Sequence, residues 1–159
     1  MSFEEFFKKL GCDWWHEYPE VFRFFDFHDK VFINVGGDCG SACVWAHQNG
    51  AKKCVMYEAD PKLFTLAYDV ARTFGVDMEI HGVWNGSTYP DGDIFTIDCE
   101  GCEASLDVDL VVSKYSQIGI AVHEWTRDKG ELLRKLAKYG FRLAYVTPDY
   151  KEQYYVLVK

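Results

Sequence analysis

The chain has 159 residues, of which 48% are hydrophobic and 17% aromatic, and it carries a formal net charge of −8. One domain usually contains ~100–200 residues, and this composition provides a buried core, so a disordered, collagen-like or coiled-coil chain is excluded. The acidic balance argues against a broad nucleic-acid surface, because neutralising phosphates requires clustered Lys and Arg. We therefore expect a single domain over residues 1–159, with an aromatic-rich helical segment at 1–29 and an α/β core at 30–159.

No segment approaches the ~20 apolar residues of a membrane span. The first residues, M-S-F-E-E, also lack the basic and apolar regions of a secretory signal, so we expect a cytoplasmic protein with no membrane partner. In that compartment the six cysteines, at positions 12, 39, 43, 54, 99 and 102, should be mostly reduced and buried. Intracellular disulfides occur in some hyperthermophiles, and Cys39 could pair with Cys99 or Cys102 if their Cα atoms come within ~7 Å.

The N-terminal segment predicts two short helices. Ser2 and Glu5 form a capping-box pattern ahead of an apolar stripe, and Gly11 should end this helix after residue 10. A second helix is expected after Pro19. The dense aromatic side chains between residues 14 and 27 either pack against the core or form a lid or stacking wall for a ligand.

From residue 30 onward, short apolar runs alternate with helix-like segments. Strands are expected at 31–35, 53–57, 78–83, 93–98, 118–123, 141–147 and 153–158, and helices at 40–48, 61–74, 103–115 and 127–138. This alternation predicts a mostly parallel sheet with helices on both faces, closed by an antiparallel hairpin that turns at 148–150. Ligands of such sheets bind beyond the carboxyl ends of the strands, near the point where the strand order reverses.

A glycine-rich turn follows the first predicted strand of the core. The segment V-G-G-D-C-G at 35–40 places G-x-x-x-G between a strand and a helix, where the backbone must turn tightly or approach a ligand. A tight turn without a ligand explains the pattern equally well. The dinucleotide fingerprint G-x-G-x-x-G fails, because Asp38 and Ser41 replace its second and third glycines, so a nicotinamide-dependent enzyme is disfavoured.

An acidic residue ends the second core strand. Glu58 lies 22 residues after Gly36, the offset at which a carboxylate on the neighbouring strand end can accept both hydroxyls of a ribose. The alternative is a solvated glutamate at a helix start, favoured there by the helix dipole. The glycine turn and the acid together favour a ligand that contains a nucleoside.

Four segments resemble one enzyme family. I-N-V-G-G-D-C-G, Y-E-A-D-P, I-D-C-E-G-C-E and A-V-H, between Val31 and Phe141, are similar to the motifs of the FkbM-type S-adenosylmethionine-dependent methyltransferases. The resemblance implies a Rossmann-like methyltransferase fold with a mostly parallel seven-stranded sheet and a C-terminal antiparallel hairpin. It also implies S-adenosylmethionine as the cofactor and O-methylation of a small or sugar-containing acceptor.

The resemblance assigns a cofactor site. The turn would lie under the methionine part, the end of the second strand would hold the ribose, and the end of the third would border the adenine. The residues concerned are Gly36, Gly37, Asp38, Gly40, Glu58, Ala59, Asp60, Val83, Trp84 and Asp98.

The segment D-C-E-G-C-E at 98–103 gathers carboxylates and cysteines at one strand end. Asp98, Glu100 or His123 is expected to act as the catalytic base, because each should lie near a strand end. The same three residues could instead hold a divalent metal that orients the acceptor, although we predict no metal. Other interpretations stay open: His123 as a buried structural histidine and Glu103 as a cap of the next helix.

The cysteines allow two more interpretations. C-x-x-C at 99–102 is typical of redox pairs, but the glycine turn and Glu58 have no role in that account. A zinc site could join Cys39, Cys43, Cys99 and Cys102, although their spacing is loose and the ion would occupy the cofactor pocket.

Three positions depart from the family pattern. Asn34 replaces the usual acid at the end of the first strand, Thr96 replaces a lysine, and Ala121 replaces a glutamate two residues before His123. Asn34 and Ala121, together with the lack of an insertion that would bind an acceptor, motivate a second hypothesis, a non-catalytic nucleoside-binding or interaction module with the methyltransferase fold. Homo-oligomerisation stays open.

Overall fold

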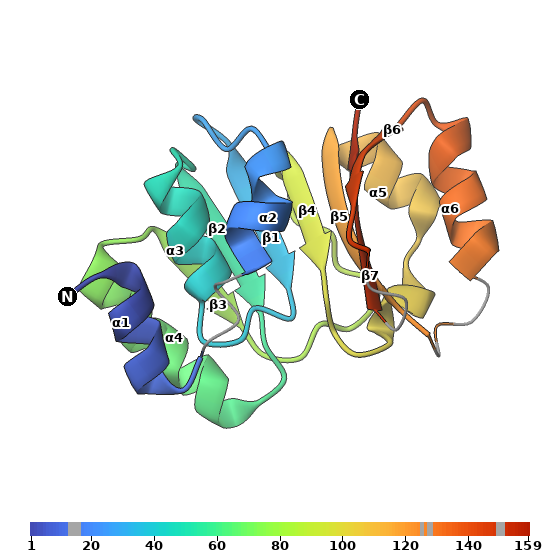
Figure 1. The fold of residues 1–159 in the computed structure, drawn as a ribbon. Helices are drawn as coiled ribbons and strands as arrows, with labels where there is room; N and C mark the ends of the chain where they lie inside the picture. Colours follow the sequence, from blue (N-terminus) through green and yellow to red (C-terminus); the bar gives the residue numbers. More distant parts are fainter. Residues whose placement is uncertain (13–16, 125, 127–128, 149–151) are drawn as a thin grey trace.

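The central feature of the computed structural model is one sheet with the strand order β3-β2-β1-β4-β5-β7-β6 (Figure 1). The structure describes residues 1–12, 17–124, 126, 129–148 and 152–159. The strands are β1 (Val31–Val35), β2 (Lys53–Tyr57), β3 (Met78–His81), β4 (Ile94–Ile97), β5 (Gln117–His123), β6 (Arg142–Val146) and β7 (Glu152–Val158). The helices are α1 (Phe3–Leu10), α2 (Tyr18–Val21), α3 (Ser41–Gln48), α4 (Pro61–Phe74), α5 (Val108–Lys114) and α6 (Lys129–Lys138).

The pairing of the strands confirms the predicted topology. β3, β2, β1, β4 and β5 run parallel, whereas β7 is antiparallel to both β5 and β6. β2 lies next to β1 on one side, and β4 lies next to β1 on the other side. The carboxyl ends of β1 and β4 therefore flank the point where the strand order reverses.

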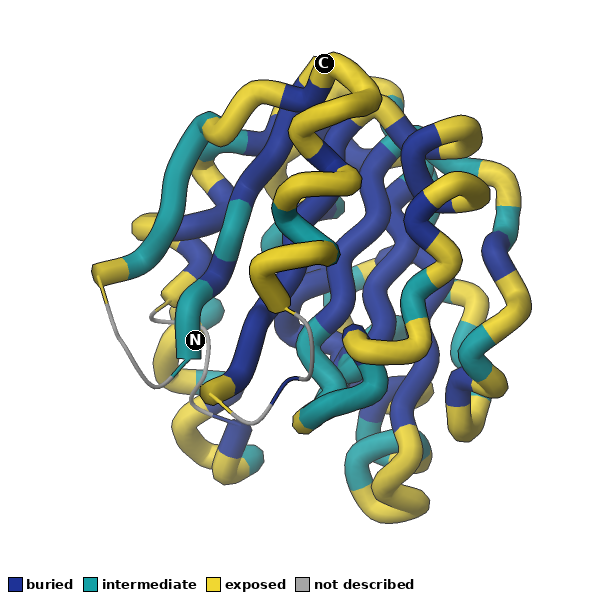
Figure 2. The backbone as a smooth tube through the Cα atoms, turned by 90° about the vertical axis from the view of Figure 1, so that its right-hand side faces the viewer, coloured by how far each residue is buried: buried dark blue, intermediate teal, exposed yellow. Residues whose placement is uncertain are grey.

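Helices cover both faces of the sheet, as Figures 1 and 2 show. Helices α1 to α4 contribute to the core on one face, and α5 and α6 to the core on the other. Buried backbone is concentrated in the strands, and exposed residues lie on the outer helix surfaces and loops (Figure 2). The central strands β4 and β5 are buried on both faces, as expected of parallel strands rich in Ile, Val and Phe.

Local signals in the sequence explain most element boundaries. The capping box of Ser2 and Glu5 is present at the start of α1, and Gly11 ends that helix in a left-handed conformation. Pro19 lies in the first turn of α2. Asp60 caps α4 by accepting from two backbone N–H groups, and Gly75 ends it. α1 and α4 agree with the predicted boundaries, whereas α2 begins at Tyr18, before Pro19 rather than after it.

Two predicted elements differ from the structure. The helix expected at 103–115 is divided into a short 3-10 turn at Cys102–Ser105 and α5, because Asp107 accepts from the Leu110 N–H and starts a new helix. The third strand ends at His81 rather than at residue 83. The turn at 149–150 and the first two residues of the helix predicted from 127 lie outside the described residues.

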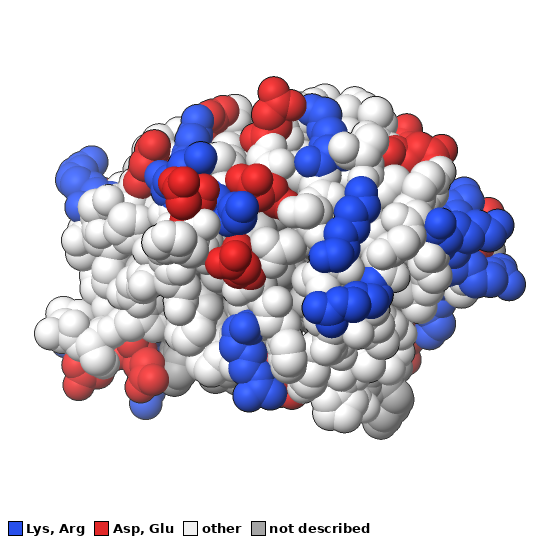
Figure 3. Space-filling model, turned by 90° about the horizontal axis from the view of Figure 1, so that it is seen from above, with Lys and Arg blue, Asp and Glu red and all other residues white. Residues whose placement is uncertain are grey.

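The amino-terminal edge of the parallel strands carries charges of both signs. Figure 3, a view from above, shows Lys and Arg intermixed with Asp and Glu rather than a broad basic surface on this face. Lys52 with Asp29 and Lys114 with Asp91 form ion pairs next to the strand starts. Within the described residues, no helix is long and apolar enough to cross a membrane.

Candidate functional site

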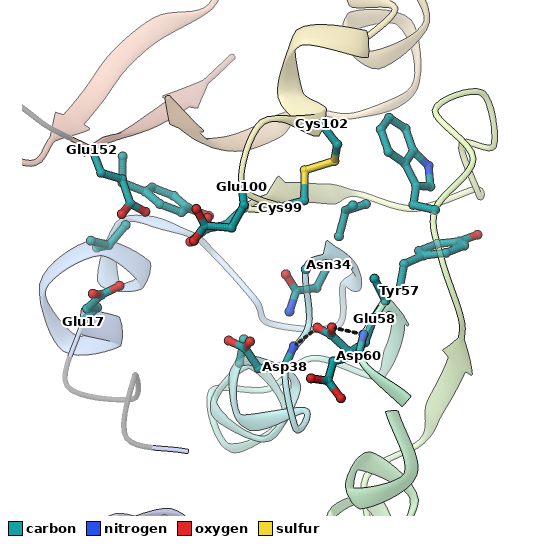
Figure 4. A pocket seen from close by; sticks show the side chains of 18 of the residues that line it. Glu17, Asn34, Asp38, Tyr57, Glu58, Asp60, Cys99, Glu100, Cys102 and Glu152 are labelled. Atoms are coloured by element: carbon teal, nitrogen blue, oxygen red, sulfur yellow. Dashed lines mark hydrogen bonds between the residues drawn. A yellow bond between two sulfur atoms is a disulfide. The ribbon is translucent and has the colours of Figure 1, made fainter. Parts of the chain in front are cut away.

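A pocket of about 560 Å³ opens at the carboxyl ends of β1, β2 and β4 (Figure 4). It lies at the reversal point of the strand order, where α/β sheets usually bind ligands. Most of the residues predicted to bind the cofactor line it: Gly36, Asp38, Glu58, Ala59, Asp60, Val83, Trp84 and Asp98. Gly37 and Gly40 do not.

Gly36 forms the floor of the pocket at the end of β1. Its N–H and that of Gly37 both donate to the Tyr57 carbonyl at 2.9 Å, which closes a tight turn. Gly36 has a φ of +82°, and a Cβ atom there would lie 1.7 Å from the Asp98 carbonyl oxygen. Glycine is therefore required at 36 by contact with the end of β4, in addition to any ligand.

Gly37 and Gly40 shape the loop from behind the pocket wall. A Cβ atom at 37 would lie 2.7 Å from the Met56 methyl group, and one at 40 would lie 3.2 Å from the Met78 side chain. Gly40 has a φ of +86° and precedes α3. Gly37 and Gly40 are not among the residues that line the pocket, and their contact with the cofactor stays a prediction.

Glu58 joins the two loops that border the pocket. One carboxylate oxygen accepts from the Asp38 N–H at 2.7 Å, and the other accepts from the Asp60 N–H at 2.7 Å (Figure 4). The residue is only 9% exposed, so the interpretation as a solvated glutamate is wrong. Each oxygen keeps a second acceptor position, which can take a ligand hydroxyl.

Flat side chains line the pocket beside β2 and β3. Trp84 is buried and donates from Nε1 to the Thr88 carbonyl at 2.7 Å, which fixes its indole, while Val83 is exposed at the rim. Tyr57 stacks on His81 with ring centroids 4.8 Å apart and also lines the pocket. Tyr57 was not predicted as a site residue, because an aromatic residue at the end of a strand is normally interpreted as part of the hydrophobic core.

The opposite wall combines the N-terminal segment with the end of β7. Tyr18 and Phe22 come from the aromatic segment, and Tyr154 and Glu152 come from β7. The Tyr18 hydroxyl is hydrogen-bonded to Ser41 at 2.7 Å. Tyr18 and Phe22 are buried in the core, which confirms the packing interpretation for them, and their role as a stacking wall stays a prediction. Residues 14–16 lie outside the described chain.

The pocket is strongly acidic. No Lys or Arg is found among the described lining residues, which include Glu17, Asp38, Glu58, Asp60, Asp98, Glu100 and Glu152. Burial, followed by the charges of Glu58 and other acids, raises the pKa of Asp38 to about 7. Burial and the nearby Glu152 raise the pKa of Asp98 to about 8, although His123 acts in the opposite direction. Such a pocket favours a cationic occupant.

His123 lies beneath this acidic wall rather than in it. Its Nδ1 is 2.8 Å from the Glu103 carboxylate, which also accepts from the Thr126 hydroxyl at 2.5 Å and from the Gly101 N–H at 2.8 Å. Burial lowers the pKa of His123, but the bond to Glu103 and the surrounding carboxylates outweigh it, so the net shift is upward. Glu103 is buried against His123, which corrects its interpretation as a helix cap; Asp107 caps α5 instead.

Four of the cysteines form disulfides, in contrast to the prediction of mostly reduced thiols. Cys12 is bonded to Cys39, with Cα atoms 6.6 Å apart, and Cys99 to Cys102, with Cα atoms 5.5 Å apart. The predicted pairing of Cys39 with Cys99 or Cys102 is therefore wrong, and so is the four-cysteine zinc site. Cys43 and Cys54 are free and buried, as expected.

Comparison with known proteins identifies relatives in two viruses. The chain is 39% identical over 155 residues to "uncharacterized protein 158B" of Sulfolobus islandicus rod-shaped virus 1, covering 96% of each chain. It is 36% identical over 154 residues to "uncharacterized protein 65" of Sulfolobus islandicus filamentous virus, covering 96% of this chain and 95% of the other. No family model matches the sequence, so the FkbM-type assignment stays a prediction.

Solved structures identify the fold. A S-adenosylmethionine-dependent methyltransferase from Mesorhizobium loti superposes with a TM-score of 0.66 at 12% identity, covering 90% of this chain and 97% of that one. A methyltransferase from Pyrococcus furiosus gives 0.66 at 12% identity, with 91% and 82% covered. Magnesium protoporphyrin IX methyltransferase from Synechocystis, solved with bound S-adenosylmethionine, gives 0.64 at 13% identity, with 84% and 72% covered.

Proposed function

Because the chain belongs to the same family as proteins of two Sulfolobus viruses and has the fold of S-adenosylmethionine-dependent methyltransferases, we propose that it is such a methyltransferase. The observation that carries the proposal is the pocket at the reversal point, with a bare glycine turn on one side and a buried carboxylate on the other. S-adenosylmethionine fits that chemistry, because its adenosine offers two hydroxyls and its sulfonium is positively charged.

Each part of the cofactor has a complementary wall. The free acceptor positions of Glu58 suit the ribose hydroxyls, and the flat surfaces of Tyr57 and Trp84 suit the adenine. Asp38 lies on the turn under the methionine part, where its carboxylate can attract the ammonium group. Asn34 is buried and accepts from the Thr96 hydroxyl at 3.0 Å, so it does not supply that charge.

The acceptor is proposed to bind on the far side of Asp98, between the aromatic wall and the β7 end. We propose an oxygen acceptor on a small or sugar-containing molecule, as the motif resemblance implies. Carboxylates of Glu17, Glu100 and Glu152 can accept hydrogen bonds from hydroxyl groups, and Tyr18 and Phe22 offer rings on which a sugar can stack. In the reaction the acceptor oxygen bonds to the methyl carbon as the carbon–sulfur bond breaks. The acceptor proton passes to a pocket carboxylate such as Asp98.

Methyl transfer is tested with methyl-labelled S-adenosylmethionine and a library of hydroxyl-bearing and amine-bearing acceptors. The proposal predicts label in one acceptor class together with an equal amount of S-adenosylhomocysteine. Binding of the cofactor without any turnover would favour the second candidate, a non-catalytic binding module. The departures at Asn34 and Ala121 are the observation that supports it. Absence of cofactor binding by folded protein would reject both.

A further inference from the structure

Ligand atoms of metal-binding type converge beside the pocket. Asp98 at the end of β4, Glu100 in the next turn and His123 at the end of β5 each place one such atom within 4.8 Å of the other two. The His123 Nε2 atom is 3.7 Å from an Asp98 oxygen and 3.6 Å from a Glu100 oxygen. A Glu152 oxygen on β7 is also 3.6 Å from it.

These spacings suit atoms that share one ion. Two ligand atoms ~2.1 Å from a metal and separated by a tetrahedral angle lie ~3.4 Å apart. The observed nitrogen–oxygen distances of 3.6–3.7 Å are within a few tenths of that value and too long for direct hydrogen bonds. The imidazole and the carboxylates therefore surround a common point at a distance suited to coordination.

The histidine is held in the orientation that a ligand requires. Glu103 engages Nδ1 at 2.8 Å, and the Thr126 hydroxyl and the Gly101 N–H hold that carboxylate from the other side. A carboxylate behind the distal nitrogen is the usual support of a metal-binding histidine, because it fixes the ring and raises its basicity. This arrangement directs Nε2 towards Asp98, Glu100 and Glu152.

A separate observation points to a missing polar partner in the same pocket. The Tyr154 hydroxyl is buried and makes no hydrogen bond of ordinary geometry within the described residues, although the Thr96 side chain is near enough to interact with it. Buried hydroxyls are normally satisfied, so an occupant with polar ligands, such as a hydrated ion, fits this wall.

We propose that Asp98, Glu100 and His123, with Glu152 as a fourth ligand, bind one divalent transition-metal ion. The mixture of one imidazole with carboxylates favours a first-row ion over calcium or magnesium. If the proposed methyl transfer is right, the ion would bind the acceptor hydroxyl and lower its pKa. Because Asp98 would then be bound to the ion, the acceptor oxygen would lose its proton to water in place of Asp98. The oxygen would donate its electron pair to the methyl carbon, while the sulfur keeps the electrons of the broken bond.

Metal binding is tested directly with Mn²⁺, an ion that binds oxygen and nitrogen ligands in preference to thiols. The full chain, with its disulfides intact and freed of metal by a chelator, is titrated while electron paramagnetic resonance records free Mn²⁺. We expect one Mn²⁺ per chain and at least tenfold weaker binding in Glu100→Gln. The Glu100 side chain is 77% exposed, so this variant should keep the fold.

The matched control is Glu131→Gln, an exposed carboxylate on α6 that pairs with Lys135. It should bind Mn²⁺ as the wild type does. Lack of saturable binding by the wild type, or equal affinity in the two variants, would overturn the metal proposal. Calorimetry with S-adenosylmethionine on the same metal-free protein separates the two proposals. Binding of the cofactor without binding of Mn²⁺ rejects only the metal site. Binding of Mn²⁺ without binding of the cofactor rejects only the proposed function.

Discussion

Glu58 has a structural role and a proposed role in binding the cofactor. Its carboxylate holds the backbones of Asp38 and Asp60, and it is the proposed ribose ligand. Glu58→Gln keeps the size of the side chain but replaces one carboxylate oxygen with an NH2 group. This new donor would face either a backbone N–H or the ribose hydroxyls.

We expect Glu58→Gln to weaken S-adenosylmethionine binding by ~100-fold or more, which is ~2.7 kcal/mol, because a charged hydrogen bond is lost and a donor is left without an acceptor. The measurement is isothermal titration calorimetry. Glu131→Gln on α6, whose exposed carboxylate pairs with Lys135 and does not line the pocket, is the control and should bind normally. Equal affinity of the two variants would remove Glu58 from the ribose site.

Asp38 should make cofactor binding depend on pH. Its pKa of about 7 means that the carboxyl is about half protonated at neutral pH, and only the ionised form attracts the cationic cofactor. Affinity for S-adenosylmethionine should therefore rise by roughly tenfold between pH 6 and 9, and level off above the pKa. S-adenosylhomocysteine, which keeps the ammonium group that Asp38 is proposed to attract, should show the same pH dependence. A flat profile for S-adenosylmethionine, or one that Asp38→Asn leaves unchanged, would contradict this role.

At the residue scale, sequence analysis identified the pocket-lining side chains that directly follow the strand ends. It missed those that come from distant parts of the chain. Glu58 was identified by its fixed offset from the glycine turn, whereas Asp38 and Asp98 were assigned through the resemblance of the motifs that contain them. Glu152 and Tyr154 were not found, because the antiparallel return of β7 brings them beside β5 from 29 and 33 positions further along, with Tyr154 opposite Ala121. The Glu103–His123 pair is likewise a contact over 20 residues.

At the element scale, Gly36 fixes how closely the end of β1 approaches the end of β4. A methyl group at 36 would overlap the Asp98 carbonyl, and the φ of +82° is strained for any other residue. A larger residue at 36 would therefore displace the end of β4 in addition to filling space in the pocket.

Gly36→Ala should lower the melting temperature by several degrees, since strain of ~1–3 kcal/mol is introduced together with a backbone clash. Gly37→Ala is the matched control, because its Cβ meets the flexible end of Met56 and its φ is not positive. Thermal denaturation followed by circular dichroism compares the two. A smaller effect at 36 than at 37 would show that the turn relaxes easily.

The elements themselves were largely predictable, because caps and apolar periodicity act locally. Asp60 before Pro61 and Gly75 after Phe74 mark both ends of α4. The division of the predicted helix at 103–115 was missed, since its apolar pattern continues through the Asp107 cap.

At the scale of the whole molecule, the disulfide between Cys12 and Cys39 ties the segment after α1 to the pocket loop. The prediction of free thiols rested on the compartment expected from the sequence, whereas pairing depends on distances between parts of the chain that only the fold brings together. The cytoplasmic location stays a prediction.

Cys12→Ser should lower the free energy of unfolding by ~3 kcal/mol, because the cross-link closes a loop with a sequence separation of 27 and restricts the unfolded chain. Chemical denaturation under oxidising conditions measures the change. Cys102→Ser opens a loop with a separation of only 3 and should cost less. Equal stability of wild type and Cys12→Ser would show that the bond is absent in solution.

Calorimetric titration of the wild-type chain with S-adenosylmethionine, and separately with NAD, tests the central claim most directly. We predict that one molecule of S-adenosylmethionine binds per chain and that NAD does not bind, because Asp38 stands where a pyrophosphate would need bare backbone. Binding of NAD, or no heat from S-adenosylmethionine with folded protein, would contradict the account.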